Sequence, residues 1–186
     1  PFFFNDSTLI FASRRVGGLG GMDLYVSLWR DTAWSAPQNL GPYVNSAYDE
    51  LTPFLARDGR TLYFSSNHTG SMGGLDIYKA VFEDKKRVWL PAQNLGLPIN
   101  SPGDDAFFRL AGDGRTAFFS SDRFESRGER DLFQVYFKEE QSEQTHSSTP
   151  ATFAQMAEAV SAEPEVRQVF IPALFYESDR DLLSAD

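Results

Sequence analysis

Short runs of apolar and aromatic residues alternate with clusters of Gly, Asp, Ser and Asn through residues 1–137. The run "TLYFSS" (61–66), for example, lies between "RDGR" (57–60) and a glycine-rich stretch. Runs of this length, rich in aromatic and β-branched residues and bounded by turn residues, are typical of β-strands. No stretch of residues 1–137 repeats its apolar positions at helical spacing. The pattern therefore predicts an all-β fold.

The pattern is also repeated. One phrase occurs three times, as "LIFASRRVGGLGGMDLY" (9–25), "LYFSSNHTGSMGGLDIY" (62–78) and, less well preserved, "AFFSSDRFESRGERDLF" (117–133). Equivalent aspartates occupy the same place in the three copies, and these are Asp23, Asp76 and Asp131. Trp34 and Trp89 recur at the same interval. A period of roughly 50 residues that contains several strands indicates β-propeller blades.

Each complete repeat is predicted to hold four strands. In the second repeat we expect them at 52–57, 61–66, 75–82 and 87–90, with residues 57–60 forming a tight hairpin. A four-stranded sheet with two apolar faces needs neighbouring sheets to cover it, as in a propeller. We therefore expect a partial propeller of about 2.75 blades, divided as 1–47, 48–102 and 103–137.

The third repeat ends after its third strand, near residue 136. Propellers often complete the last blade with a strand from the other end of the chain, so we expect its fourth strand from upstream sequence. Propellers have about 4–8 blades, so three repeats predict part of a longer ring. The glycines between the aromatic runs are expected to let the chain turn tightly.

Strand parity predicts which loops lie together. In an up-and-down sheet, the loops between the second and third strands emerge on the same side as the crossovers between repeats. The loops are 13–21, 66–74 and 121–130, and the crossovers are 39–50 and 94–105. The opposite side is expected to carry short polar hairpins. The loop-rich side is therefore the candidate contact surface.

Charge and cysteine content exclude several classes of function. Residues 1–137 hold 16 acidic and 14 basic residues, whereas 138–186 hold 10 acidic and 3 basic ones. No basic stripe is available to neutralise phosphates, which argues against nucleic acid as a partner. The absence of Cys excludes disulfides, thiolate metal sites and a Cys nucleophile. No apolar run reaches the roughly 20 residues of a transmembrane segment.

Two sets of acidic residues suggest metal binding but have a structural interpretation that we favour. Asp23, Asp76 and Asp131 follow glycine-rich loops, where a carboxylate accepts backbone N–H groups and pins the loop. The acid pairs Asp49/Glu50 and Asp104/Asp105 lie where a repeat begins, without the alternating oxygen ligands of a Ca²⁺ loop. No catalytic motif occurs, so we expect no enzyme activity, no cofactor and no metal.

Arginine and aromatic residues occupy corresponding positions in the predicted loops. The candidate partner-binding residues are Arg14, Arg15, His68, Arg123, Phe124 and Arg127. One interpretation is solubilising charge on exposed loops, and the other is a contact surface, because Arg and aromatic side chains are favoured interface anchors. Trp34 and Trp89, in the fourth strand, are expected to pack rather than to stack on a ligand.

The motifs "DG..LYFSS", "GG.D.Y", "W..P.NLG" and "INS..DE" together resemble the TolB-type, WD-like propeller repeat of outer-membrane-associated proteins of the Bacteroidetes type. The resemblance covers residues 1–137. It implies a β-propeller in the periplasm, associated with the outer membrane and with secretion or gliding machinery. In such proteins an OmpA-like domain commonly follows the propeller.

Residues 138–186 are consistent with an OmpA-like domain that follows the propeller. Residues 138–152 form a polar, acidic stretch that predicts a disordered linker. Residues 153–186 predict a short helix and then the start of an α/β OmpA-like domain, whose peptidoglycan-binding residues would lie beyond Asp186. The expected function is a non-catalytic scaffold that binds an envelope protein and is tethered to peptidoglycan. The alternatives are a propeller that accompanies a peptidase or hydrolase, and one that binds carbohydrate or a small ligand.

Overall fold

The computed structural model describes residues 1–137 and 176–177. Every regular element in these residues is a β-strand, and the strands form three antiparallel sheets. The prediction of an all-β fold is therefore confirmed. The predicted linker at 138–152 and the predicted OmpA-like segment at 153–186 lie outside the described residues, apart from the two at 176–177.

Sheet I is built from the first repeat. Its three main strands are antiparallel neighbours, β1 (Phe2–Asn5), β2 (Thr8–Ser13) and β3 (Asp23–Arg30). Two short strands, β4 (Ala33–Trp34) and β5 (Gln38–Asn39), then pair with β3.

Sheet II repeats this order with β6 (Glu50–Leu55), β7 (Thr61–Ser66) and β8 (Asp76–Glu83). The pair β9 (Val88–Trp89) and β10 (Gln93–Asn94) then joins β8. The prediction of four strands in each complete repeat is thus wrong in detail, because the outer strand is divided into two. Pro37 and Pro91 lie in the gaps, where a residue without an N–H group cannot continue a ladder.

Sheet III contains β11 (Asp105–Leu110), β12 (Thr116–Ser121) and β13 (Asp131–Phe137). Its fourth strand is β14 (Tyr176–Glu177), which pairs with the end of β13. The predicted upstream strand would lie ahead of Pro1, so it stays a prediction. Only Tyr136 and Phe137 of β13 pair with β14, which lies well downstream in the sequence.

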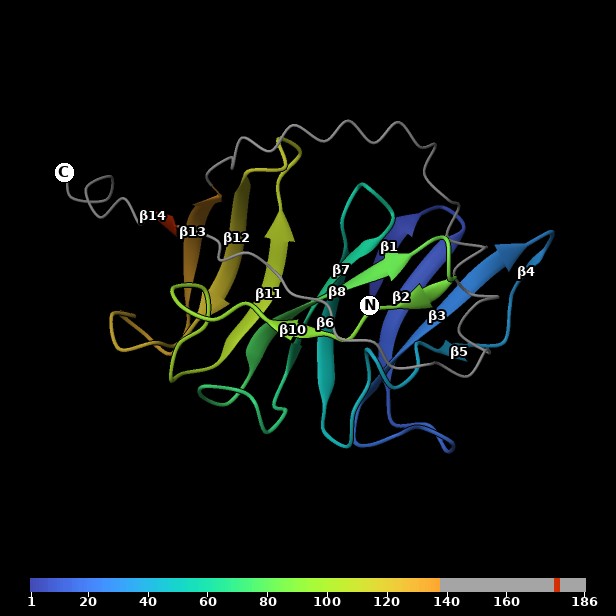
Figure 1. Cartoon of the computed structure of the whole chain (residues 1–186), viewed down its shortest axis with the longest axis horizontal. Helices are drawn as coiled ribbons and strands as arrows, with labels where there is room; N and C mark the ends of the chain where they lie inside the picture. Colours follow the sequence, from blue (N-terminus) through green and yellow to red (C-terminus); the bar gives the residue numbers. More distant parts are fainter. Residues whose placement is uncertain (138–175, 178–186) are drawn as a thin grey trace.

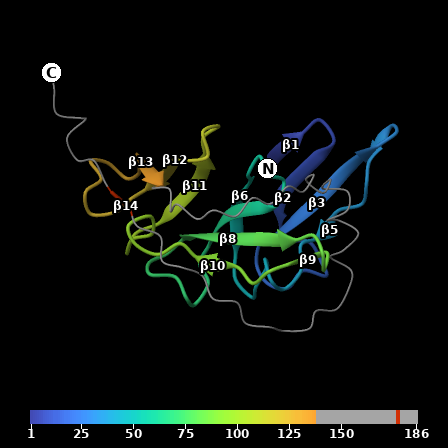
Figure 2. The same cartoon turned by 45° about the horizontal axis from the view of Figure 1, so that its top comes forward.

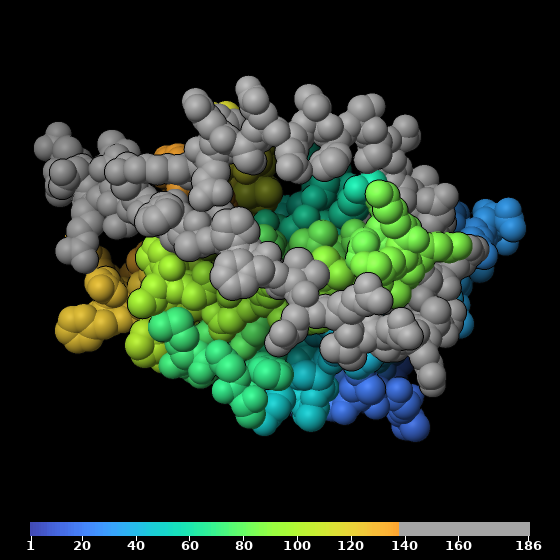
Figure 3. Space-filling view, viewed as in Figure 1, coloured from blue at the N-terminus to red at the C-terminus, as the bar shows by residue number. Residues whose placement is uncertain are grey.

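The three sheets follow one another in sequence order across the molecule. Figure 1 and Figure 2 show sheet II between sheets I and III in both views. In the space-filling view, green residues of the second repeat lie between the blue first repeat and the yellow and orange third repeat (Figure 3). Strand β6 of sheet II packs on β1, β2 and β3, and on its other side β11 packs on β6, β7 and β8.

Separate hydrophobic cores hold these sheets together. Alternation along β7 sends Leu62 and Phe64 into the core shared with sheet I, and Tyr63 into the core shared with sheet III. All three side chains are buried, which confirms that this strand is covered on both faces. The first core also contains Ile10 and Leu24 of sheet I.

The first strands of the three sheets lie next to one another. The ring of Phe2 in β1 meets that of Phe54 in β6 edge to face, with 5.2 Å between the centroids. The guanidinium of Arg109 in β11 lies over both rings, 5.6 and 5.3 Å from their centroids. Burial lowers the pKa of Arg109. One cation therefore connects the inner strands of all three repeats.

The longer loops and the short hairpins occupy different sides of the sheets. Figure 1 shows the loops that follow β2 and β7 at the lower edge, the loop that follows β12 at the left beside the lower end of that strand, and the β6–β7 and β11–β12 hairpins at the upper edge. In the β6–β7 hairpin, Asp58 Oδ1 accepts the N–H groups of Arg60 and Thr61, and Gly59 has a φ of 67°. This is the tight turn that the sequence predicts.

The paired glycines have a role beyond the tight turning that the sequence predicts. A Cβ at Gly73 would lie 2.3 Å from the carbonyl oxygen of Gly103 and 2.4 Å from that of Pro102. A Cβ at Gly20 would lie 2.4 Å from the backbone of the following crossover at Ser46 and Ala47. The expectation that these glycines serve tight turning is therefore incomplete. They allow the crossover that leads to the next repeat to approach closely, and the crossover and the loop meet there, as strand parity predicts.

Candidate functional site

One position in each repeat carries a polar side chain beside a pair of stacked aromatic rings. The position is held by Arg15, His68 and Arg123, which occupy equivalent places in the three repeats. The rings come from the second and third strands and have centroids 5.8–6.2 Å apart, namely Phe11 and Tyr25, Phe64 and Tyr78, and Phe119 and Phe133. The three copies differ in what they contact.

In sheet III the position is filled by Arg123. Its guanidinium carbon lies 4.6 Å from the centroid of Phe133, and its Nη2 donates to Asp105 Oδ1 at 2.8 Å. Nη2 also donates to the carbonyl of Ile99, at 2.6 Å, and Nη1 donates to that of Pro98 at 2.9 Å. The Asp105 carboxylate is fully buried. Arg123 thus connects the 94–105 crossover to sheet III.

In sheet I the position is filled by Arg15, which adopts the same stacking. Its guanidinium carbon lies 5.3 Å from the centroid of Phe11 and 4.8 Å from that of Tyr25. Its Nε donates to Ser13 Oγ at 3.4 Å. Among the described residues no carboxylate forms an ion pair with Arg15, and the side chain is exposed.

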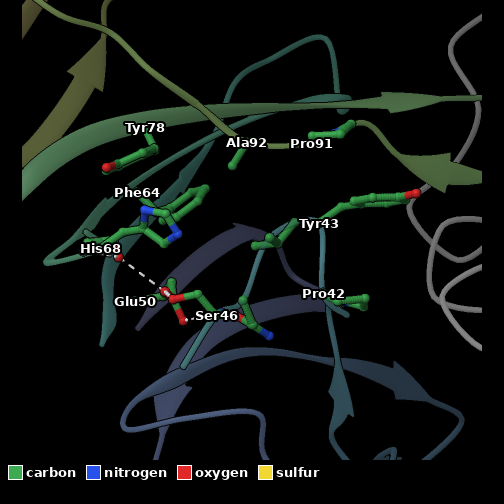
Figure 4. Close-up of a pocket in the computed structure, with 12 residues that line it drawn as sticks. Pro42, Tyr43, Ser46, Glu50, Phe64, His68, Tyr78, Pro91 and Ala92 are labelled. Atoms are coloured by element: carbon green, nitrogen blue, oxygen red, sulfur yellow. Dashed lines mark hydrogen bonds between the residues drawn. The ribbon is translucent and has the colours of Figure 1, made fainter. Parts of the chain in front are cut away.

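In sheet II the position is filled by the shorter His68, and a cavity of about 160 Å³ lies beside it. The His68 ring meets the Tyr78 ring edge to face at 6.2 Å, and its Nδ1 accepts the N–H of Gly70 at 3.1 Å. Figure 4 shows His68, Phe64 and Tyr78 on one side of the cavity, and Glu50 with Ser46 on another. Because His68 is exposed, the cavity reaches the surface.

Among the described residues that line this cavity, Glu50 is the one ionisable carboxylate, and it is 1% exposed. Its oxygens accept the N–H and the hydroxyl of Ser46 at 3.0 and 2.5 Å, and the hydroxyl of Ser66 at 3.1 Å. Burial raises the pKa of Glu50, and the hydrogen bonds from Ser46 and Ser66 oppose part of that rise. Within residues 1–137 no Lys or Arg forms an ion pair with it.

The repeated aspartates bind the loops that precede them. Asp23 accepts the N–H groups of Leu19 and Gly20. Asp76 accepts the N–H of Met72 at 2.8 Å, and Asp131 accepts that of Arg127 at 2.6 Å. Asn39 and Asn94 donate to the first two aspartates, at 2.7 and 2.6 Å. These are contacts of a side chain that fixes a loop.

The acid pairs at the start of the second and third repeats divide their roles. Asp49 and Asp104 accept the N–H groups of Met22 and Leu75, both at 2.8 Å, and so connect each crossover to the preceding loop. Glu50 and Asp105 instead point inward and are buried. In the part of the chain that the structure describes, no three His, Cys, Asp or Glu side chains are grouped as metal ligands would be.

The other candidate contact residues remain on the surface. Arg14 Nη2 reaches Asp49 Oδ1 at 3.4 Å, Phe124 is fully exposed, and the Arg127 side chain is exposed. No hydrogen bond, ion pair or ring contact among the described residues joins any two of the six candidates. They lie in corresponding loops but do not form one cluster.

The two repeat tryptophans occupy equivalent positions but have different surroundings. Trp89 is buried in the core between sheets I and II, where its ring meets that of Phe82 edge to face at 5.4 Å. Trp34 makes the same contact with Trp29 at 5.5 Å but lies on a face of sheet I that no described sheet covers. Trp89 therefore packs as expected, and Trp34 packs only within its own sheet.

Sequence reasoning did not identify the cavity or the role of Glu50. The sequence does contain a signal for this site, which is an acid at the start of the first strand of the second and third repeats. Glu50 precedes His68 by the same number of residues as Asp105 precedes Arg123. Recognising it required knowing that each crossover folds against the next sheet.

No protein-family model matches the chain, and no curated protein is similar enough to count as a relative. Within the described residues, no helix is long and apolar enough to span a bilayer.

Proposed function

We propose that the chain is part of a TolB-type β-propeller that serves as a non-catalytic protein-interaction scaffold in the bacterial cell envelope. The observation that supports the interaction role most directly is the grouping of the longer loops on one side, with Arg14 and Phe124 exposed on them. Exposed Arg and aromatic side chains on loops that rigid sheets position are suited to binding a protein.

Packing between the sheets supports the propeller. Each sheet is apolar on both faces, equivalent sheets succeed one another, and their inner strands lie together around Arg109. In the ring, a preceding blade covers the outward face of sheet I, where Phe3, Trp29 and Trp34 are exposed.

The cellular setting in this proposal comes from the resemblance of the repeat motifs. A periplasmic, outer-membrane-associated position and a tether to peptidoglycan through a downstream OmpA-like domain both follow from it. The loop-rich side then binds an outer-membrane or periplasmic protein assembly, without catalysis.

The propeller is tested by comparing Trp34 in this chain with Trp34 in the full-length protein. Acrylamide quenches the fluorescence of exposed tryptophan, so a W34F variant should remove strongly quenched emission from this chain. In a closed ring the same substitution should remove weakly quenched emission. Equal, strong quenching of Trp34 in both proteins would contradict a closed ring.

The interaction role is tested in the native host with the full-length protein. Its envelope partner is first identified by cross-linking and then followed quantitatively. Replacing Arg14 and Phe124 by Ala should reduce recovery of that same partner. Lys85→Ala provides the matched control, because Lys85 is exposed in the β8–β9 hairpin, away from these loops. Unchanged recovery with the loop variant, or an equal loss with the control, would contradict the proposal.

A further inference from the structure

The Arg123 bridge shows which chemical group the position over the stacked rings accepts. The guanidinium there has a carboxylate at Asp105, carbonyls at Pro98 and Ile99, and the hydroxyl of Ser121, to which Nε donates at 2.9 Å. Rings lie beneath it, with the Phe119 centroid 5.1 Å away. Every guanidinium nitrogen therefore has a protein partner, and the positive charge lies over aromatic faces.

All of these partners have counterparts at the equivalent positions one repeat earlier. The carboxylate corresponds to that of Glu50, the hydroxyl to that of Ser66, the carbonyls to those of Tyr43 and Val44, and the rings to those of Phe64 and Tyr78. All six residues line the cavity beside His68. The cavity between the 39–50 crossover and sheet II thus repeats the lining of the Arg123 site without its arginine.

The cavity has room for the missing group. Its volume is about 160 Å³. One water molecule needs only roughly 10–15 Å³, and a cavity of about 150 Å³ admits a benzene molecule. A guanidinium group is planar and no larger than a benzene ring, so it fits together with part of an alkyl stem.

The charge in the cavity also favours a cation. Glu50 is almost completely buried, and its three hydrogen bonds come from serine groups that carry no charge. A carboxylate offers about four acceptor positions, so one further donor can be accommodated. A buried carboxylate without a cation is costly, and a guanidinium that donates to it relieves that cost.

We propose that the cavity between the 39–50 crossover and sheet II binds an alkylguanidinium group, oriented by Glu50 and stacked over Phe64 and Tyr78 as Arg123 is stacked one repeat later. Two sources carry this group, an arginine side chain of another polypeptide and a free alkylguanidinium. The site does not depend on the proposed propeller or envelope partner, because its lining lies within this chain. Binding is therefore measurable on the purified chain, and its failure would leave the proposed scaffold role untouched.

The test uses isothermal titration and NMR on the purified chain with three probes. These are ethylguanidinium, the peptide acetyl-Gly-Arg-Gly-amide, and the same peptide with citrulline, which is neutral and nearly isosteric, in place of arginine. Ethylguanidinium and the arginine peptide should bind and shift the resonances of His68 and Tyr78. The citrulline peptide should bind at least about tenfold more weakly, because the charge-assisted hydrogen bond is lost. Tighter binding of the arginine peptide than of ethylguanidinium identifies a polypeptide source, and the reverse identifies a small molecule.

Two substitutions locate the site. His68→Arg places an arginine where Arg123 lies in the next repeat, so it should fill the cavity and abolish binding of both cationic probes. Glu50→Gln keeps the shape and should weaken binding at least about tenfold. The matched control is Asp113→Asn, in the β11–β12 hairpin of sheet III. This variant should bind both cationic probes as the unchanged chain does.

Three results would overturn the proposal. They are no binding of either cationic probe, equal binding of the citrulline peptide, or unchanged binding in the folded Glu50→Gln variant. If His68→Arg does not fold, Glu50→Gln and the citrulline peptide still decide the question.

Discussion

The same side chains are buried on one face of sheet II and exposed on the equivalent face of sheet I. Phe82 and Trp89 are each 2% exposed, whereas their counterparts Trp29 and Trp34 are 42% and 37% exposed. Within each pair the rings meet edge to face at almost the same distance. The repeat therefore determines the local cluster, and the neighbouring sheet determines whether the cluster is covered.

The comparison explains why composition alone is a poor guide to stability in this chain. Sheet I covers the aromatic face of sheet II, and sheet II covers that of sheet III. No described sheet covers the corresponding face of sheet I. A residue's contribution to folding thus depends on which repeat contains it, although the repeats share one pattern.

The largest difference is expected between the two tryptophans. Trp89→Ala should lower the free energy of unfolding by about 3–5 kcal/mol, because it empties a large volume in the core. Trp34→Ala should change it by no more than about 1 kcal/mol, because that side chain is partly exposed. Urea unfolding of both variants measures the difference. Equal losses of unfolding free energy in the two variants would show that burial by the neighbouring sheet does not determine the contribution of these tryptophans to stability.

Glycine replacements probe the same contrast at the backbone. Gly73→Ala should cost about 1–3 kcal/mol, because its Cβ would collide with the backbone at Pro102 and Gly103, which must move. At Gly128, the equivalent position in the third repeat, a Cβ meets nothing within 4 Å. Gly128→Ala should therefore be neutral within about 0.5 kcal/mol in the same unfolding assay. A similar cost at both positions would contradict the close approach of the crossover.

Glu50 allows the buried interface to be tested by pH. Burial raises the pKa of Glu50 in the folded chain above its value in the unfolded chain. The favourable contribution of Glu50 to the free energy of unfolding is therefore present below the unfolded-state pKa, and it is lost as pH rises through the folded-state pKa. Glu50→Gln should therefore raise Tm at pH 7 relative to the unchanged chain, with little difference at pH 4. The glutamine can accept from the Ser46 N–H and donate to the hydroxyls of Ser46 and Ser66, so the fold is kept. A Tm difference independent of pH would argue against a desolvated carboxyl.

The smallest effect is expected at the exposed β11–β12 hairpin, which no sheet covers. Hydrogen bonds from the hydroxyl and N–H of Thr116 and from the N–H of Arg115 lower the pKa of Asp113 to about 2. The stabilisation from this carboxylate is thus present above pH 4 and is lost as pH falls through about 2. Thr116→Val should move the pKa of Asp113 back toward 3.8, as measured by NMR titration of its carboxyl carbon. An unchanged pKa would show that the Thr116 hydroxyl is not the main cause.

Local features of the fold were predictable from the sequence because they arise within short segments. The strand 61–66 was predicted with its observed limits, and the Asp58–Gly59 turn follows from residues three positions apart or fewer. The split of the outer strand was missed, because a single Pro37 or Pro91 interrupts an otherwise continuous pattern. The role of Gly73 was missed because its neighbours come from residues 102–103, in the crossover to the next repeat.

The candidate site also has features that the sequence predicts and features that only the structure shows. The equivalence of Arg15, His68 and Arg123 could be read from the repeat period alone. Their different roles could not, because Arg123 donates to the carbonyls of Pro98 and Ile99, which the crossover from the preceding repeat brings beside it. His68 and Arg123 look like equivalent loop residues in the sequence, yet one lies beside a cavity and the other fills the corresponding space.

The sequence by itself determined the strands, the hairpins and the threefold recurrence of one aromatic pattern, because those depend on alternation and turn chemistry over a few residues. Only the tertiary structure decided which aromatic faces are covered, why the paired glycines are needed and where a buried carboxylate lies without a cationic partner among the described residues. Those outcomes depend on which repeat packs against which, and that packing brings together residues that are tens of positions apart in the chain.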